Sequence, residues 1–231
     1  MPAAHTISRV ILERSLHPSW LSNAYVLAAE PGGAAVFVDS GAPLEPLLDV
    51  VERERLRPTH LLVTHGHADH VAGNDELVRR FGLEVTTGAV ETGGLTIDVV
   101  ATPGHSDDGV SFVVGEELCF TGDTLFRDSV GGGPAAEIRR SVMDVLMALP
   151  HGLRVLPGHT DETTIGREWD ENPFVRYWRG LEGEDGRSCV VNGDPATLVV
   201  WSPDYDGKGK ALVRFADGAE AIVGASRIAG L

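Results

Sequence analysis

The stretch Leu61-Leu62-Val63-Thr64-His65-Gly66-His67-Ala68-Asp69-His70 carries the strongest structural and chemical signal in this chain. Its apolar start predicts a short buried strand, so the polar residues fall on the turn at the strand's carboxyl end. Ligands of open α/β sheets usually bind at that end. His65 and His67 share a face of extended backbone, whereas Asp69 and His70 follow the turn and can point to a second position. Imidazoles combined with a carboxylate favour zinc or iron-type cations over calcium or magnesium.

Three further ligand-type side chains stand in the same context, directly after an apolar strand and a short turn. They are His105 in Thr102-Pro103-Gly104-His105, Asp123 in Thr121-Gly122-Asp123 and His159 in Pro157-Gly158-His159. Side chains at neighbouring strand ends converge in space although they are far apart in sequence. We therefore expect one metal centre built from all four segments. The remaining histidines lack this context and are expected to be surface or structural residues: His5, His17, His60 and His151.

Strands and helices alternate along the chain, which favours the α/β class over all-β. Beside the strand before His65, strands are expected at residues 7–12, 24–28, 35–38, 84–87, 95–101, 110–114, 118–120 and 154–156. Helices are expected at 44–56, 70–81, 137–149 and 170–181, with Pro58 after the first and Gly82 at the end of the second. Asp39 ends the strand 35–38 and is equally interpreted as a turn cap or as an acceptor for the N–H of a metal-bound histidine.

The composition narrows the class of partner. The net charge is −15, with two lysines among 19 basic residues, so the chain is a poor candidate for binding the phosphate backbone of nucleic acids. Cys119 and Cys189 form neither a disulfide framework nor a C-x-x-C pair. Because no segment has the apolar length of a signal peptide or a membrane span, we expect a soluble, cytoplasmic protein with no membrane partner.

The C-terminal residues have a different pattern from the rest. A polar linker at 181–187 precedes strands expected at 197–201, 211–215 and 219–223, with turns at Asp206-Gly207 and Asp217-Gly218. This predicts a small SH3-like β-barrel or β-meander over residues 188–231, after a larger domain over residues 1–183. The module could bind a partner, cover the active site, mediate dimerisation or simply stabilise the larger domain.

The pattern His-x-His-x-Asp-His, with Pro-Gly-His105, Thr-Gly-Asp123 and Pro-Gly-His159, resembles the metallo-β-lactamase superfamily in its glyoxalase II-like branch. The segments Thr163–Glu168 and Asn172-Pro173-Phe174 are also similar to that branch. The resemblance implies an αββα sandwich for residues 1–183, two mixed sheets face to face with helices outside. It implies two metal sites, the first made of His65, His67 and His105 and the second of Asp69, His70 and His159, with Asp123 bridging the two metals.

The implied activity is hydrolysis of an acyl-thiol, a thioester, by a hydroxide that bridges two divalent cations. Zinc is the first expectation, with iron or manganese as alternatives. Asp69 and Asp123 would be catalytic as well as metal-binding, and Arg127 is a candidate for holding a substrate carboxylate. We expect a small-molecule substrate and a monomer or homodimer.

Differences from the family separate the alternatives. The commonest zinc lactamases carry Cys where this chain has Asp123, and flavin-di-iron oxygen reductases carry Glu in place of His67. RNA-processing nucleases carry large insertions that this acidic chain lacks. Glyoxalase II itself has a helical C-terminal region and a Cys-Gly-Arg-like segment where this chain has residues 127–133. Two other functions stay open: a persulfide dioxygenase with one iron on His65, His105 and Asp123, and a non-enzymatic metal-dependent scaffold.

Overall fold

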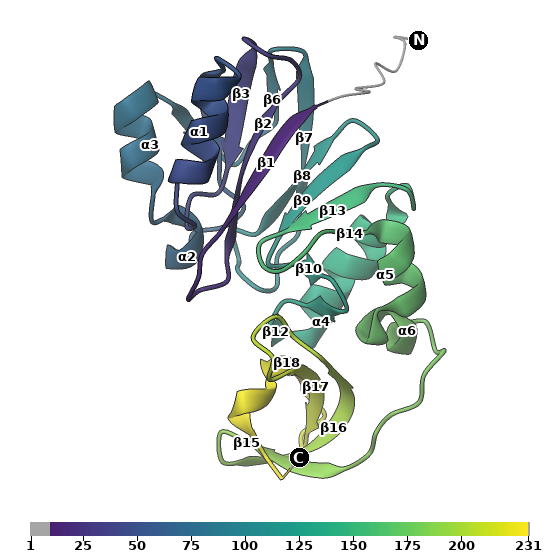
Figure 1. Ribbon diagram of the computed structural model, residues 1–231. Coiled ribbons are helices and arrows are strands. Elements are labelled where there is room, and N and C mark those ends of the chain that lie inside the picture. The colour runs from purple at the N-terminus through teal and green to yellow at the C-terminus, as the bar shows by residue number, and fades with distance from the viewer. Residues whose placement is uncertain (1–9, 231) are drawn as a thin grey trace.

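The computed structural model describes residues 10–230 and arranges most of them in layers, two facing sheets with helices on both outer sides (Figure 1). The first sheet has the strand order β1-β2-β3-β4-β5 and the second β14-β13-β9-β8-β7-β6. Both sheets are mixed, because β3, β4 and β5 run parallel, as do β9 and β13, while the other neighbours are antiparallel. The predicted αββα sandwich is confirmed.

The first sheet consists of β1 (Ile11–Leu16), β2 (Asn23–Ala28), β3 (Ala34–Val38), β4 (Arg57–Leu62) and β5 (Glu84–Thr86). The second consists of β6 (Val90–Thr92), β7 (Leu95–Ala101), β8 (Val110–Val114), β9 (Leu118–Gly122), β13 (Arg154–Pro157) and β14 (Thr163–Thr164). A small hairpin joins β10 (Leu125–Phe126) and β11 (Ser129–Val130). The helices are α1 (Glu45–Arg53), α2 (Ala68–Val71), α3 (Asn74–Phe81), α4 (Ala135–Arg139), η1 (Arg140–Val145), η2 (Leu146–Ala148), α5 (Ile165–Glu171) and α6 (Pro173–Trp178).

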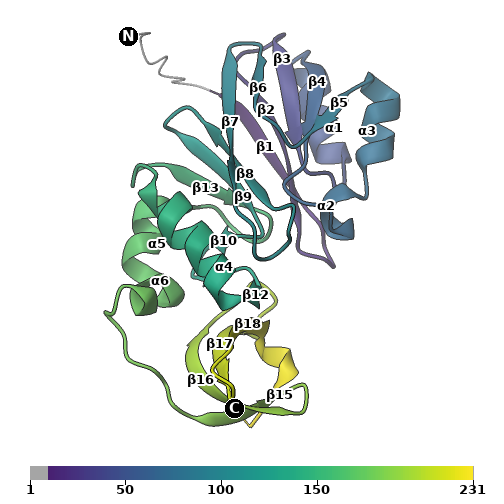
Figure 2. The same cartoon turned by 180° about the vertical axis from the view of Figure 1, so that it is seen from behind.

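Side-chain alternation along the strands builds two of the apolar cores. In β2, Tyr25 and Leu27 face the second sheet, where they pack with residues such as Phe112 and Phe120. The intervening Ala24, Val26 and Ala28 face α1 and α3 and pack with residues such as Leu47 and Leu77. A third core lies on the outer side of the second sheet, where Figure 2 shows α4, α5 and α6. Each of the three cores therefore lies between two neighbouring layers of the sandwich.

Several element boundaries differ from the prediction for local reasons. The helix expected at 70–81 is divided into α2 and α3, because the N–H of Gly73 donates to the Ser40 carbonyl oxygen at 3.1 Å and not to the preceding helical turn. The helix expected at 170–181 is interrupted at Pro173, whose ring leaves no N–H for the preceding turn. The strand at 95–101 pairs with 90–92, while the strand at 84–86 joins the first sheet.

Other predicted elements lie where expected or outside the described residues. The helix at 137–149 is the continuous run α4-η1-η2, with a π-helical middle. Gly82 ends α3 with φ +66°, as predicted. The first strand is shifted to residues 11–16, and the predicted strand residues 7–9, like His5, lie outside the described residues. Both cysteines are free and buried.

The C-terminal residues form a third sheet with the order β12-β18-β17-β16-β15-β19. Its strands are β15 (Ser188–Val191), β16 (Asp194–Ser202), β17 (Lys210–Phe215), β18 (Glu220–Gly224) and β19 (Ile228–Ala229), with a short 3-10 helix η3 (Ala225–Arg227). The sixth strand, β12 (Gly133–Pro134), comes from the larger part of the chain and pairs with β18. The division after residue 183 therefore stays a prediction. Over residues 10–230, no helix is both long enough and apolar enough for a membrane crossing.

Candidate metal centre

The loops after four strands bring the predicted ligands to one edge of the sandwich. His65 follows β4, and His67 precedes the short helix α2, whose first turn carries Asp69 and His70. From the second sheet, His105 follows β7, Asp123 follows β9 and His159 follows β13. Together, the structure gathers all seven predicted ligands in overlapping groups whose ligand atoms lie within 4.8 Å of one another.

The first group contains three histidines: His65, His67 and His105. The Nε2 atom of His65 lies 3.0 Å from Nδ1 of His67, and Nε2 of His105 lies 3.1 Å from the same atom. Three ring nitrogens therefore face one point, as a cation held by imidazoles requires. His65 is buried, whereas His67 is exposed, so this point is open to solvent on one side.

The second group contains Asp69, His70 and His159. Oδ2 of Asp69 lies 3.4 Å from Nε2 of His159 and 3.8 Å from Nε2 of His70. Both histidines are almost fully buried, and Asp69 is the more exposed member, with a side chain 29% exposed. The group therefore has two fixed imidazoles and one carboxylate that solvent can reach.

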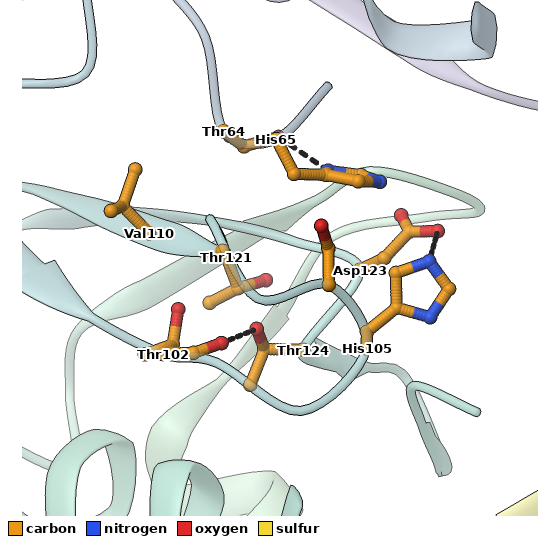
Figure 3. A pocket seen from close by; sticks show the side chains of 10 residues that line it. Thr64, His65, Thr102, His105, Val110, Thr121, Asp123 and Thr124 are labelled. Atoms are coloured by element: carbon orange, nitrogen blue, oxygen red, sulfur yellow. Dashed lines mark hydrogen bonds and ion pairs between the residues drawn. The ribbon is translucent and has the colours of Figure 1, made fainter. Parts of the chain in front are cut away.

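Asp123 lies between the two groups. Its Oδ1 is 3.3 Å from Nε2 of His70, and its Oδ2 is 3.4 Å from Nε2 of His105 and 3.3 Å from Nε2 of His159. Figure 3 shows the Asp123 carboxylate between the side chains of His65 and His105. One carboxylate thus contacts members of both groups, which is the arrangement that two cations sharing a ligand need.

Backbone contacts beside the centre are so close that a side chain would not fit. A Cβ added to Gly158 would lie 2.3 Å from Oδ1 of Asp123 and 2.7 Å from Cε1 of His70. A Cβ on Gly41 would lie 1.6 Å from the Asp69 carbonyl oxygen. These glycines are needed because the chain passes directly against the ligand groups.

Outer hydrogen bonds orient three of the imidazoles. Asp39 accepts from Nδ1 of His70 through Oδ2 at 2.8 Å, and its two oxygens also accept from the backbone N–H and the hydroxyl of Thr64. Nδ1 of His65 lies 3.1 Å from Oγ1 of Thr64, and Nδ1 of His105 lies 3.1 Å from the Gly132 carbonyl oxygen. Asp39 therefore has the contacts of the second interpretation above, an acceptor for a histidine N–H.

Without a metal, the charges of the centre favour protons on the second group. Burial alone would lower the pKa of His70, but the Asp39 and Asp123 carboxylates raise it to about 11. Burial alone would also lower the pKa of His159, but the Asp123 and Asp69 carboxylates raise it to about 9. In the first group, burial and the neighbouring His70 lower the pKa of His65 to about 4.

The carboxylates are ionised near neutral pH. The hydrogen bond with His159 lowers the pKa of Asp69 below its ordinary value. Burial would raise the pKa of Asp123, but the imidazoles of His159 and His70, each with Nε2 3.3 Å from the carboxylate, hold it well below its ordinary value. Two ionised carboxylates, Asp69 in the second group and Asp123 between the groups, form an environment that stabilises cations.

The donor set fits divalent metal ions. Nε2 of His70 and Oδ1 of Asp123 are buried without a hydrogen-bond partner, which is costly unless a cation or water completes their coordination. A ligand set that combines imidazole nitrogens with carboxylate oxygens suits zinc or iron. Beside Asp123 and His65 lies a small cavity of about 10 Å³, which also touches His105 (Figure 3).

The other predicted residues lie away from the centre. Arg127 is in the turn between β10 and β11, 4.0 Å from Asp128, and lines a different cavity with Arg14 and Arg154. His17 stacks on Trp20 with ring centroids 4.5 Å apart. His60 faces Glu84, and His151 lies near Trp169.

One contact of the centre had no signal in the sequence. Tyr205, in the loop between β16 and β17, stacks on the ring of His159. Tyr205 and Lys210 also line a cavity of about 450 Å³ that His105 borders as well. A tyrosine in the polar turn Asp204-Tyr205-Asp206 follows no strand-and-turn pattern like that of the ligands, so only the fold could place it.

Known proteins resemble this chain in sequence and in fold. A family model described as the metallo-beta-lactamase superfamily matches residues 18–92. An uncharacterized protein of Mycobacterium tuberculosis is 31% identical, with 66% of this chain and 92% of that protein covered. A hydroxyacylglutathione hydrolase of Rhizobium meliloti is 37% identical, but only 55% of this chain and 57% of that enzyme are covered.

Solved structures give the same comparison in three dimensions. The B3 metallo-beta-lactamase BLEG-1 is 29% identical with a TM-score of 0.66, covering 71% of this chain and 99% of its own. TTHA1623, solved in a di-iron-bound form, is 30% identical with a TM-score of 0.58, covering 69% of this chain and 98% of its own.

Proposed function

This chain belongs to the metallo-β-lactamase superfamily, and from that premise we propose that it is a binuclear metallo-hydrolase that cleaves the thioester bond of a small acyl-thiol. One observation carries the proposal: two ligand groups, His65/His67/His105 and Asp69/His70/His159, meet on either side of the Asp123 carboxylate. Each group would hold one divalent cation, and Asp123 would contact both.

Zinc is the proposed metal, since imidazole with carboxylate is a common zinc ligand set. Iron is the alternative, and the di-iron form of the similar TTHA1623 supports it. When bound, two such cations supply an activated water and polarise a substrate carbonyl.

The side chains then have distinct parts in the reaction. Asp69 is the site carboxylate that solvent reaches, so it is placed to orient the attacking water. Asp39 would keep His70 in the tautomer whose Nε2 faces the centre. His67, exposed at the rim, would complete the first group beside the substrate.

The ionisation of the site supports a thioester as the substrate class. Asp69 and Asp123 have pKa values below the ordinary range, so neither can donate a proton to a leaving group at neutral pH. A thiolate leaves without such help, because its conjugate thiol has a pKa of ~8.5 and the thiolate is therefore a far weaker base than an alkoxide or an amine anion. The similarity to a hydroxyacylglutathione hydrolase supports the same class.

A free-thiol release assay tests this proposal. Protein loaded with zinc is mixed with S-acyl glutathione, an acyl-coenzyme A and an acyl-cysteamine, and a β-lactam is included because BLEG-1 is a B3 lactamase. We expect thiol release from at least one thioester and no β-lactam opening. A double variant, His67→Ala with Asp123→Ala, should lose the activity. Metal-loaded protein that cleaves no acyl-thiol refutes the proposal.

The second candidate is the persulfide dioxygenase, which needs one iron. Its three ligands are near one another, since His105 Nε2 lies 3.4 Å from Asp123 and His65 groups with both residues. The complete second group argues for two metals instead. One iron per chain together with oxygen uptake on a persulfide would favour the dioxygenase. A scaffold would keep its function in the double variant.

A further inference from the structure

The ring of His159 is held differently from the rings of His65, His70 and His105. Nδ1 of His65, of His70 and of His105 each has a hydrogen-bond partner behind the ring. Nδ1 of His159 is buried and has no partner in the described part of the chain, although its Nε2 faces Asp69 and Asp123. The usual outer hydrogen bond that fixes a ligand histidine is therefore missing at His159, although its ring is buried.

An aromatic stack takes the place of that hydrogen bond. The ring of Tyr205 lies parallel to the imidazole of His159, with a centroid distance of 4.1 Å and an interplanar angle of 3°. Phe126 meets the imidazole edge-on at 5.8 Å. Phe126 and Tyr205 also contact each other at 5.6 Å, so His159 sits in a corner of two aromatic rings.

The loop that carries Tyr205 is anchored at both ends. Lys210, the first residue of β17, forms a nearly buried ion pair with Asp204 at 3.1 Å. Its ammonium group lies 5.4 Å from the Tyr205 ring and 5.1 Å from the Phe126 ring. At the end of β16, the hydroxyl of Ser202 donates to the Asp128 carbonyl oxygen at 2.5 Å. The C-terminal sheet therefore holds Tyr205 at a fixed position over the second ligand group.

We propose that Tyr205 is a positioning residue for His159, through which the C-terminal module controls how tightly the second ligand group, Asp69/His70/His159, holds its metal. The inference rests on the proposed binuclear site, and it assigns the module a part in metal retention. Removing the ring would let the imidazole of His159 rotate, because no acceptor at Nδ1 restrains it. The first group, in which His65 and His105 have their own outer hydrogen bonds, would keep its affinity.

A zinc titration of the full chain against a chromophoric chelator tests this without any substrate. We expect the wild type to bind two equivalents. Tyr205→Leu should weaken the binding of the zinc ion held by the second ligand group about 10- to 100-fold and leave the affinity of the first group unchanged. Tyr205→Phe keeps the ring and should bind both as the wild type does. Trp20→Leu is the matched control, since it removes an aromatic ring stacked on His17, which belongs to neither ligand group.

Circular dichroism verifies that each variant is folded. If Tyr205→Leu does not fold, Lys210→Gln leaves the ring in place but releases its loop, and should weaken the second equivalent alone by a smaller factor. Unchanged affinity for the second equivalent in a folded Tyr205→Leu protein, or a wild type that binds only one metal, overturns the inference. A wild type that binds two metals but cleaves no thioester refutes only the proposed activity.

Discussion

Asp39 combines a strained backbone with a dense set of hydrogen bonds. Its φ of +55° lies in the left-handed region, and its carboxylate accepts from Thr64 twice and from His70 once. Asparagine tolerates the same backbone conformation. The Asp39→Asn variant therefore removes the negative charge and the second acceptor oxygen of the side chain but keeps the backbone conformation.

For Asp39→Asn we expect a folded protein whose second metal equivalent binds about 10- to 100-fold more weakly, because His70 loses its anionic partner. Chelator competition with zinc measures the change. Asp98→Asn, at an exposed position of β7, is the control and should bind as the wild type does. Equal affinity in both variants would mean that Asp39 serves only the turn.

The pKa values predict how pH affects metal binding. At pH 7 the metal-free protein carries protons on His70, with a pKa of about 11, and on His159, with a pKa of about 9, whereas His65, at about 4, is neutral. A proton bound at pH 7 must leave before its nitrogen takes a metal, so filling the second group releases about two protons. Its affinity should fall as the pH drops below about 11, where His70 gains a proton, and more steeply below about 9, where His159 gains a second, while the first group loses metal only in acid. Calorimetric titration in buffers of different ionisation enthalpy measures the protons, and zinc binding without proton release contradicts these protonation states.

The sequence alone could predict which seven candidate ligands meet at one edge of the sandwich, because their segments each follow an apolar strand and a turn. The roles of Asp39 and Tyr205 depend on which side chains the fold brings together. Asp39 was ambiguous since a cap and an outer acceptor need the same residue at the same place. Tyr205 lies 46 positions beyond its partner His159 in a different sheet, and no periodicity relates them.

At the scale of elements, the segment after His159 is held by a buried carboxylate. Glu168 in α5 is fully buried and accepts hydrogen bonds from Thr163, Arg167, the Asp128 backbone N–H and Asn172. Asn172 in turn caps α6 by accepting from the backbone N–H groups of residues 174 and 175. This network joins β14, α5, α6 and the β10–β11 turn into one unit behind the centre.

Glu168→Ala should lower the free energy of unfolding by about 3–5 kcal/mol, because the buried groups around it lose their shared acceptor. Glu171→Ala is the matched control. Glu171 also pairs with Arg167, at 2.9 Å, but its side chain is 60% exposed, so its loss should cost about 0.5 kcal/mol or less. Chemical denaturation measures both. If Glu168→Ala lowers the free energy of unfolding no more than Glu171→Ala does, the hydrogen bonds of Glu168 do not stabilise the fold.

The pattern of apolar residues was enough to place most strands and helices, but not their interruptions. The break at Gly73 reflects an N–H that donates to Ser40, and the break at Pro173 reflects a missing N–H, and each acts at one residue within an otherwise helical pattern. The strand β6 (Val90–Thr92) is not among the predicted strands, because its three residues are too short for a period-two pattern and it is defined by its pairing with β7.

At the scale of the whole molecule, the C-terminal sheet shares an apolar core with the larger part of the chain. Val199, Val200, Leu212 and Ile222 of that sheet are buried in the same cluster as Ile138 of α4. Such a shared core couples the unfolding of the two parts, so we expect a single cooperative calorimetric transition.

Ile222→Ala should lower the stability of the whole chain by roughly 2–5 kcal/mol and leave the single transition intact, since the cavity opens in the shared core. Val190→Ala, at a position 39% exposed on the same sheet, should cost far less. Two resolved transitions in the wild type, with only one shifted by Ile222→Ala, would show that the module folds independently.

The central claim is that seven side chains from four strand ends hold two cations around Asp123. Elemental analysis of the chain purified without added metal tests it most directly. We predict two equivalents of divalent metal per chain, with zinc as the expected metal. In Asp123→Ala the metal content should fall to one equivalent or none. A wild type that carries a single iron, or no metal even after incubation with zinc, would contradict the claim.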